Sequence, residues 1–165
     1  MPRGGPLAFS FKVDPSSHRP DSIQSTLEAL LKSYEGTTYP GSYSLTLRAD
    51  WWSIEPTRAK TRSGETNAVT PVLSARITIP HDVSLTLSAT LEKVLAATSA
   101  TTGTKIVLGC RLPPQWASSV LGDDIDGKTA REAIGSILDA SGSSMSWVLL
   151  YDPTFHYYVF TPYST

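Results

Sequence analysis

The residues that could carry out acid–base or nucleophilic chemistry are scattered along this chain, and no catalytic motif joins them. A nucleophile needs a neighbouring base, and that base needs a group that orients it. The three histidines, His18, His81 and His156, each fall in a predicted turn beside proline or aromatic residues. No serine stands in a Gly-x-Ser-x-Gly turn, and no His-x-x-x-His pair offers two zinc ligands. We therefore predict no catalytic residue, no cofactor and no metal site, and interpret the histidines as solvated loop side chains.

An acidic cluster and two glycine turns are the remaining candidates for small-ligand chemistry. Asp123, Asp124 and Asp126 could offer oxygen ligands to calcium, but they lack the regular spacing and the distal glutamate of an EF-hand. We interpret them as a solvated turn whose negative charge lies near the N-terminus of the next helix. The turns Ser63-Gly64 and Leu108-Gly109 lack the lysine and the spacing of a phosphate-binding loop, so nucleotide binding is not expected.

Three tryptophans are the candidates for binding a partner. Trp51, Trp52 and Trp116 could form a partner-binding surface, because large aromatic side chains carry much of the binding energy of protein interfaces. The alternative is that they form a small satellite core beneath the loops. Cys110 is the only cysteine, which excludes an internal disulfide, and we interpret its thiol as buried and inert.

The composition is that of a folded globular protein, with 40% hydrophobic and 18% charged residues among 165. The net charge is −1, so the chain has no basic field for a phosphate backbone, and we expect a protein partner or self-association rather than nucleic acid. The longest apolar runs, such as Trp147–Tyr151, have the length of a strand, so no transmembrane segment is predicted. Met1–Pro6 is not followed by the apolar stretch of a signal peptide, so none is expected in this chain.

Hydrophobic periodicity predicts a strand-helix-strand unit in the first part of the chain. Phe9–Val13 and Tyr43–Leu47 alternate as half-buried strands do. A helix between them begins at a cap, Asp21 or Ser22, and ends near Gly36, before a turn at Tyr39–Gly41. Its apolar face comprises Ile23, Leu27, Leu30, Leu31 and Tyr34. The polar stretch 57–70 is predicted to be an exposed loop.

The second part of the chain repeats strands and helices. Strands are predicted at Val72–Ile79, at Lys105–Leu108 and around Val120-Leu121, and a hairpin pairs Met145–Tyr151 with Tyr157–Phe160 across the turn Asp152–His156. One helix starts at Ser84 or Thr86 and ends at Gly103; another follows Thr129 and ends at Gly142. The first buries Leu87, Leu91, Val94, Leu95 and Thr98, and the second Ala130, Ala133, Ile134, Ile137 and Leu138.

These elements predict an α+β fold, a two-layer sandwich of helices on a mixed sheet built from repeated strand-helix-strand units. We expect residues 1–71 to form an N-terminal unit and residues 72–165 a second α+β domain; the alternative is one continuous domain.

The order of elements after Ile77 resembles a known family. The residues that carry the likeness are Ile77–Pro80, Leu91–Leu95, Thr102–Val107, Gly127–Ile134, Ile137–Gly142 and Tyr157–Phe160. Over about residues 75–160 the pattern resembles the secretin and TonB-receptor short N-terminal domain, STN, of bacterial envelope proteins. The resemblance implies a non-enzymatic domain that makes protein contacts at the periplasmic side of secretion pores or outer-membrane receptors. Because the matching region is preceded by a further unit and is not followed by a barrel, we expect a free-standing or excised envelope domain.

The functional hypothesis from the sequence is a non-catalytic protein-interaction or assembly domain of a bacterial cell envelope or secreted protein. The alternatives are a hydrolase with an unrecognised polar site and a structural subunit that assembles through its strand edges. The resemblance implies a periplasmic or secreted location, and a cytoplasmic one is the alternative.

Overall fold

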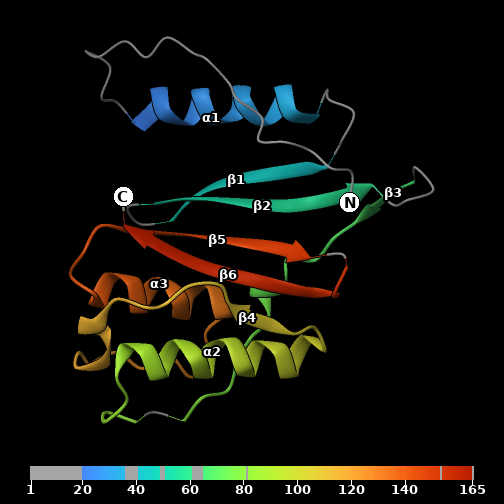
Figure 1. Ribbon diagram of the computed structural model, residues 1–165. Helices are drawn as coiled ribbons and strands as arrows, with labels where there is room; N and C mark the ends of the chain where they lie inside the picture. Colours follow the sequence, from blue (N-terminus) through green and yellow to red (C-terminus); the bar gives the residue numbers. More distant parts are fainter. Residues whose placement is uncertain are drawn as a thin grey trace. The chain divides into compact units, whose positions relative to one another are not determined.

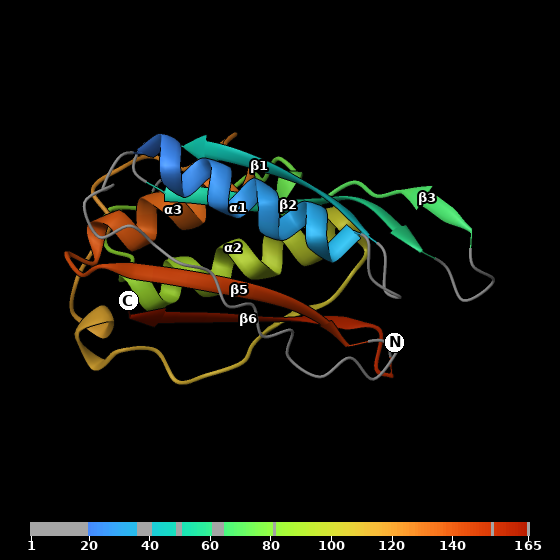
Figure 2. The same ribbon diagram turned by 90° about the horizontal axis from the view of Figure 1, so that it is seen from above.

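The computed structural model describes residues 20–35, 41–48, 51–60, 65–80, 82–152 and 154–164 (Figures 1 and 2). The fold is α+β, and the chain divides into two compact units, Met1–Pro71 and Val72–Thr165. The predicted strand Phe9–Val13, the stop at Gly36 and most of the turn Tyr39–Gly41 lie outside the described residues.

The first unit packs a helix, α1 (Pro20–Glu35), on an antiparallel sheet of β1 (Ser42–Arg48), β2 (Trp51–Lys60) and β3 (Thr66–Ala68). The rings of Tyr34 in α1 and Tyr43 in β1 lie 5.6 Å apart, edge to face. The helix begins at Pro20, so Asp21 and Ser22 lie in its first turn instead of capping it. Proline is tolerated there because the first N–H groups of a helix have no partner within it.

The exposed loop predicted at residues 57–70 is wrong at both ends, where the structure has strands instead. β2 continues to Lys60, and β3 returns beside it with Arg58 opposite Ala68 and Lys60 opposite Thr66. The Val69 N–H donates to the Thr57 carbonyl at 3.0 Å and extends the ladder. The side chains of β3 are exposed, so backbone hydrogen bonds hold this strand in the sheet. Its sequence therefore shows no alternation of apolar and polar residues from which a strand could be predicted.

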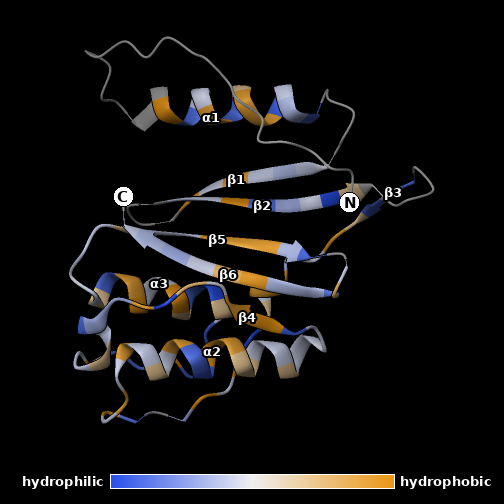
Figure 3. Cartoon of the chain, viewed as in Figure 1, coloured by the Kyte–Doolittle hydropathy of each residue, from blue (hydrophilic) through white to orange (hydrophobic). Residues whose placement is uncertain are grey.

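The second unit lays two helices, α2 (Leu87–Thr102) and α3 (Ala130–Ala140), on one side of a mixed three-stranded sheet (Figure 1). The sheet order is β4 (Ile106–Leu108), β6 (Tyr157–Ser164), β5 (Met145–Asp152); β4 runs parallel to β6, and β5 antiparallel to it. Hydrophobic segments recur along both helices and in all three strands (Figure 3). The buried core between the layers comprises Leu73, Ile77, Ile79, Leu87, Leu91, Val94, Leu95, Ile106, Trp116, Leu121, Ile125, Ala130, Ala133, Ile134, Ile137, Leu138 and Phe160.

Both helices begin as the sequence predicts. The Thr86 hydroxyl accepts the Ala89 N–H at 3.3 Å, and α2 ends at Gly103, whose φ of 67° is left-handed. Thr129 and Glu132 form a capping box at the start of α3. All ten side chains predicted to point inward from these two helices are buried, which confirms both helix faces.

Two predicted strands of the second unit are wrong. Residues Val72–Ser74 form a 3₁₀ turn, η1, and only Arg76 in the predicted strand Val72–Ile79 makes an isolated bridge, to Thr129. Ile77 and Ile79 are buried as the alternation predicts, but their extended backbone pairs with a loop: the Ile77 N–H donates to the Lys128 carbonyl at 3.0 Å. Around Val120 only one isolated bridge forms, to Thr86.

Candidate partner-binding surface

Of the three tryptophans, the structure describes the side chains of Trp52 and Trp116. Trp116 lies in η2 (Pro114–Ala117), is 0% exposed and belongs to the core, so it is unavailable to a partner and its assignment to the partner surface is corrected. The turn that starts at Pro113-Pro114 places this ring under α2, where the Ser88 hydroxyl donates to the Trp116 carbonyl at 3.3 Å. The structure thus supports the alternative interpretation for Trp116, a core residue beneath a loop.

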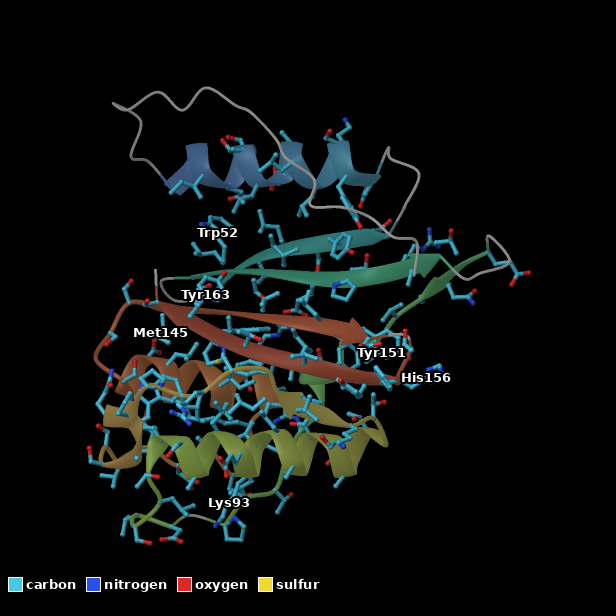
Figure 4. The ribbon with its side chains drawn as sticks, viewed as in Figure 1. Trp52, Lys93, Met145, Tyr151, His156 and Tyr163 are labelled. Carbon is cyan, nitrogen blue, oxygen red and sulfur yellow. The ribbon has the colours of Figure 1, made fainter. Side chains whose placement is uncertain are left out.

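Trp52 faces the helix of its own unit. It pairs with Leu47, which lies on the same face of β1 as Tyr43, the residue in contact with α1. Figure 4 shows Trp52 on the side of the strands that faces α1, and the side chain is half-buried. The side chain of Trp51 lies outside the described part of the chain.

The second unit instead presents apolar side chains on the sheet face opposite its helices. Along β5, Trp147 points toward the core and stacks on Phe160 at 5.6 Å, so its neighbour Val148 points away. Val148 is 37% exposed, Leu150 58% and, on β6, Tyr163 47%. We call this surface the outer face; it comprises Ser146, Val148 and Leu150 of β5 and their partners Tyr163, Thr161 and Val159 of β6.

The hairpin that joins β5 to β6 carries a cluster of rings, which we call the aromatic tip: Tyr151, Phe155, His156, Tyr157 and Tyr158. Phe155 and Tyr157 stack at 5.9 Å, and Tyr151 lies 5.0 Å from Tyr158. Figure 4 shows Tyr151 and His156 together at this end of the hairpin, with Met145 and Tyr163 at the other. Phe155 is 69% exposed, so the tip offers an aromatic surface to solvent.

The backbone of the turn holds these rings in place. The Asp152 carboxylate accepts the N–H groups of Thr154 at 2.8 Å and Phe155 at 3.2 Å, as aspartate does in tight turns. His156 has a φ of 56°, and its Nδ1 lies 3.1 Å from the Tyr151 hydroxyl oxygen.

Burial, and secondarily the nearby Tyr151, raise the pKa of Tyr158 above its ordinary value of 10.0. The turn predicted at Asp152–His156 is confirmed.

The acidic cluster has a structural role. The Asp126 carboxylate accepts the Ile79 N–H at 2.9 Å, and the Asp124 carboxylate accepts the Asp126 N–H at 2.9 Å. Within the described ranges, no group of three His, Cys, Asp or Glu side chains is placed to hold a metal ion. A nearby depression of about 20 Å³ has room for roughly one water molecule. It is lined by Ile79, Pro80, Asp82, Leu85, Thr90, Leu121, Asp123 and Ile125.

The other reactive side chains remain separate. Cys110 is half-buried, with its sulfur 3.7 Å from the Pro162 carbonyl oxygen. His18 and His81 lie outside the described residues, and His156 is exposed at the aromatic tip.

The sequence predicts the hairpin, whereas the exposed outer face is seen only in the structure. The signal for it was the run Val148-Leu149-Leu150, which is apolar on both faces of a strand, where a half-covered sheet normally alternates apolar with polar residues.

Comparison with known proteins finds no relative. No family model, no curated protein and no solved structure matches this chain. Among the described helices, none has the length and apolar character needed to cross a membrane.

Proposed function

We propose that this protein is a non-catalytic protein-interaction or assembly module, and that its partner binds the outer face and the aromatic tip of the second unit. The observation that carries the proposal is the group of exposed side chains on the outer face, Val148, Leu150 and Tyr163, together with the exposed Phe155 in the turn of the same hairpin. Grouped exposed apolar side chains are typical of protein-binding surfaces, whereas single ones are common on any protein.

The placement of the rings favours a protein partner. The rings of Phe155 and Tyr157 stack on each other, and Tyr157 lies on the same face of β6 as Val159, so binding there costs little side-chain entropy. Tyrosine hydroxyls at the edge of an apolar surface can also bind backbone groups of a partner. The surface suits a partner that offers apolar side chains and backbone polar groups together.

The resemblance to the STN domain adds an expectation of where the partner is found. That family makes protein contacts in the bacterial envelope, so we expect the partner to be an envelope or secreted protein.

The proposal is tested with two equally exposed residues. Phe155 and Val83 are each 69% exposed, but Val83 lies in the loop before α2 and not on the sheet. A photo-crosslinking amino acid is placed at each position in living cells, the crosslinked partner is identified, and its affinity for the purified protein is measured by calorimetry. Each of Leu150→Ser and Phe155→Ser should weaken binding about tenfold, because each removes roughly 1.5 kcal/mol of apolar burial.

Val83→Ser should leave the affinity unchanged. A partner that binds the Leu150 and Phe155 variants as tightly as the unmodified protein would show that the outer face is not the binding site. Circular dichroism of each variant checks that the fold is retained.

A further inference from the structure

A second unusual feature of this sheet is the edge of β5 that faces away from β6, with which no strand of the described residues pairs. β5 lies at the end of the order β4-β6-β5, and it pairs with β6 over eight residues without a shift of register. Natural edge strands are normally protected by lysine, proline, a bulge or short length. β5, Met-Ser-Trp-Val-Leu-Leu-Tyr-Asp, has none of these devices, and its only charge is the terminal Asp152.

The other strands at sheet ends differ in these respects. β4 is three residues long. β1 has an irregular register between Ser42 and Tyr43 and ends in Arg48, and β3 has three residues. Both short strands and bulges limit pairing with another chain. Among the described edge strands, β5 is therefore the best suited to add a further strand.

We propose that β5 pairs antiparallel with β5 of a second copy of this chain, about a twofold axis through Leu149, so that the two sheets become one six-stranded sheet. This goes beyond the proposed function, which leaves the identity of the partner open. The self-pairing does not require that function, because a separate partner could bind the outer face of a monomer.

The register follows from the side chains. Directly opposite residues in an antiparallel pair lie on the same face, so the axis must pass through a residue and not between two residues. An axis through Leu149 sets Val148 opposite Leu150 of the second copy on the outer face. On the inner face it sets Trp147 opposite Tyr151, and Leu149 opposite itself. Apolar side chains then meet apolar ones from Trp147 to Tyr151.

The same register accommodates the single charge. Asp152 falls opposite Ser146 of the second copy, whose hydroxyl can donate to the carboxylate, and the two Asp152 side chains lie at opposite ends of the joined strands. Moving the axis to Val148 would set Ser146 against Leu150, and moving it to Leu150 would set Asp152 against Val148. Those alternatives oppose polar and apolar groups, so the axis through Leu149 is the best matched.

The inner row is already held in position for such pairing. The Arg131 guanidinium lies over the Trp147 ring, 5.2 Å from its centre, and Phe160 stacks on the same ring. The joined strands span about 24 Å at roughly 3.4 Å per residue. A strand edge of this length buries less than the ~800 Å² per partner of a standard interface. We therefore expect a dimer that dissociates on dilution.

The first test is self-association of the full chain by sedimentation velocity, at concentrations up to about 100 µM, where a dimer with micromolar Kd is almost fully formed. A concentration-dependent dimer is expected, and a monomer throughout would overturn the proposal. Two variants with the same substituted positions then test the contact. Val148→Lys with Leu150→Lys opposes like charges across the axis, whereas Val148→Lys with Leu150→Glu opposes unlike charges.

The lysine–glutamate variant should retain the dimer at low salt, and the double-lysine variant should lose at least tenfold in association constant relative to it. Equal association of the two variants would overturn the pairing. Both positions are exposed in the single chain, and thermal melts of the two variants check that each is folded.

The register is tested by disulfide formation in a Cys110→Ser background. Opposite residues have Cα atoms about 4.5–5.5 Å apart, within the range that a disulfide requires. An equimolar mixture of Val148→Cys and Leu150→Cys chains should crosslink well above either variant alone. Equal crosslinking in all three samples, or none in the mixture, would overturn the axis through Leu149. Partner binding by a chain that stays monomeric would leave the proposed function standing, so the two proposals fail separately.

Discussion

Gly109 is predicted to control whether β4 can join the sheet. This residue follows β4, and its N–H donates to the Phe160 carbonyl at 2.8 Å, which continues the parallel ladder past Leu108. A Cβ added there would collide with the Val159 side chain and would lie 2.6 Å from the Thr161 hydroxyl oxygen and 3.4 Å from the Phe160 carbonyl oxygen. The glycine is needed because β6 approaches closely. Gly109→Ala therefore forces either β6 or the segment that follows β4 to move.

The cost follows from the stiffness of the neighbour. Val159 is β-branched and held in the central strand, so its methyl group cannot turn aside freely. Overpacking of this kind costs about 1–3 kcal/mol. In a domain of this size each kcal/mol lowers the melting temperature by about 4–8 °C. We expect Gly109→Ala to lower the melting temperature of the second unit by roughly 4–24 °C in differential scanning calorimetry.

Gly122 provides a matched control. A Cβ at Gly122 would have no heavy atom within 4 Å, and its backbone is not left-handed. Gly122→Ala makes the same change in the unfolded chain, so it should be neutral or stabilise by up to about 1 kcal/mol. Adding Val159→Ala to Gly109→Ala should restore part of the loss by removing the obstructing methyl groups. A Gly109→Ala protein that melts at or above the Gly122→Ala protein would refute this account of the close approach.

Two further perturbations test the core and its pH dependence. Leu91→Asp and Ile134→Asp each place a carboxylate at a position with 0% exposure, so each should abolish the cooperative melt of the second unit in calorimetry; an unchanged melt would show that the helix face is misassigned. Because the pKa of Tyr158 is raised in the folded state, its contribution is complete below pH 10.0, the ordinary value, and is lost as the pH rises through the folded pKa. Tyr158→Phe should therefore reduce the loss of thermal stability above pH 10, and an identical alkaline profile in both proteins would contradict the assignment.

The helices of the second unit could be predicted from the sequence because three local signals agree at each one. Thr86 and Gly103 bound α2, Thr129 caps α3, and the buried positions repeat at helical spacing between them. Caps and periodicity depend on neighbouring residues alone, so they can be recognised without knowledge of the tertiary structure.

The pairing of extended segments could not be predicted in the same way. Ile77 and Ile79 alternate as a strand does, but no neighbouring strand holds their backbone. Ile77 exchanges hydrogen bonds with Gly127 and Lys128, and the Ile79 N–H donates to the Asp126 carboxylate. In β3 the reverse holds, because the strand exists without any apolar residue facing a core. Alternation reports which side chains are buried, and the partner of the backbone depends on residues far away in the chain.

The candidate site depends on a further property that a sequence does not contain, namely which face of a sheet is covered. Val148-Leu149-Leu150 is consistent with a strand buried between two layers. In the second unit only the face bearing Leu149 and Trp147 meets the helices, and Val148 and Leu150 remain exposed on the other. Trp116 is the opposite case. Its large ring suggests a partner-binding residue, but in the fold it is completely buried.

The outer face and the edge of β5 belong to one strand, and this links the two proposals physically. Pairing through Leu149 would bring Val148 of each copy beside Leu150 of the other, so two short apolar rows would become one continuous row across the axis. A partner that contacts both halves of this row would bind the dimer more tightly than the monomer, and by linkage it would stabilise the dimer to the same degree. An unprotected apolar edge is a hazard for a chain that remains alone. The same edge becomes a specific contact because pairing about Val148 or Leu150 opposes polar and apolar side chains, whereas pairing about Leu149 does not.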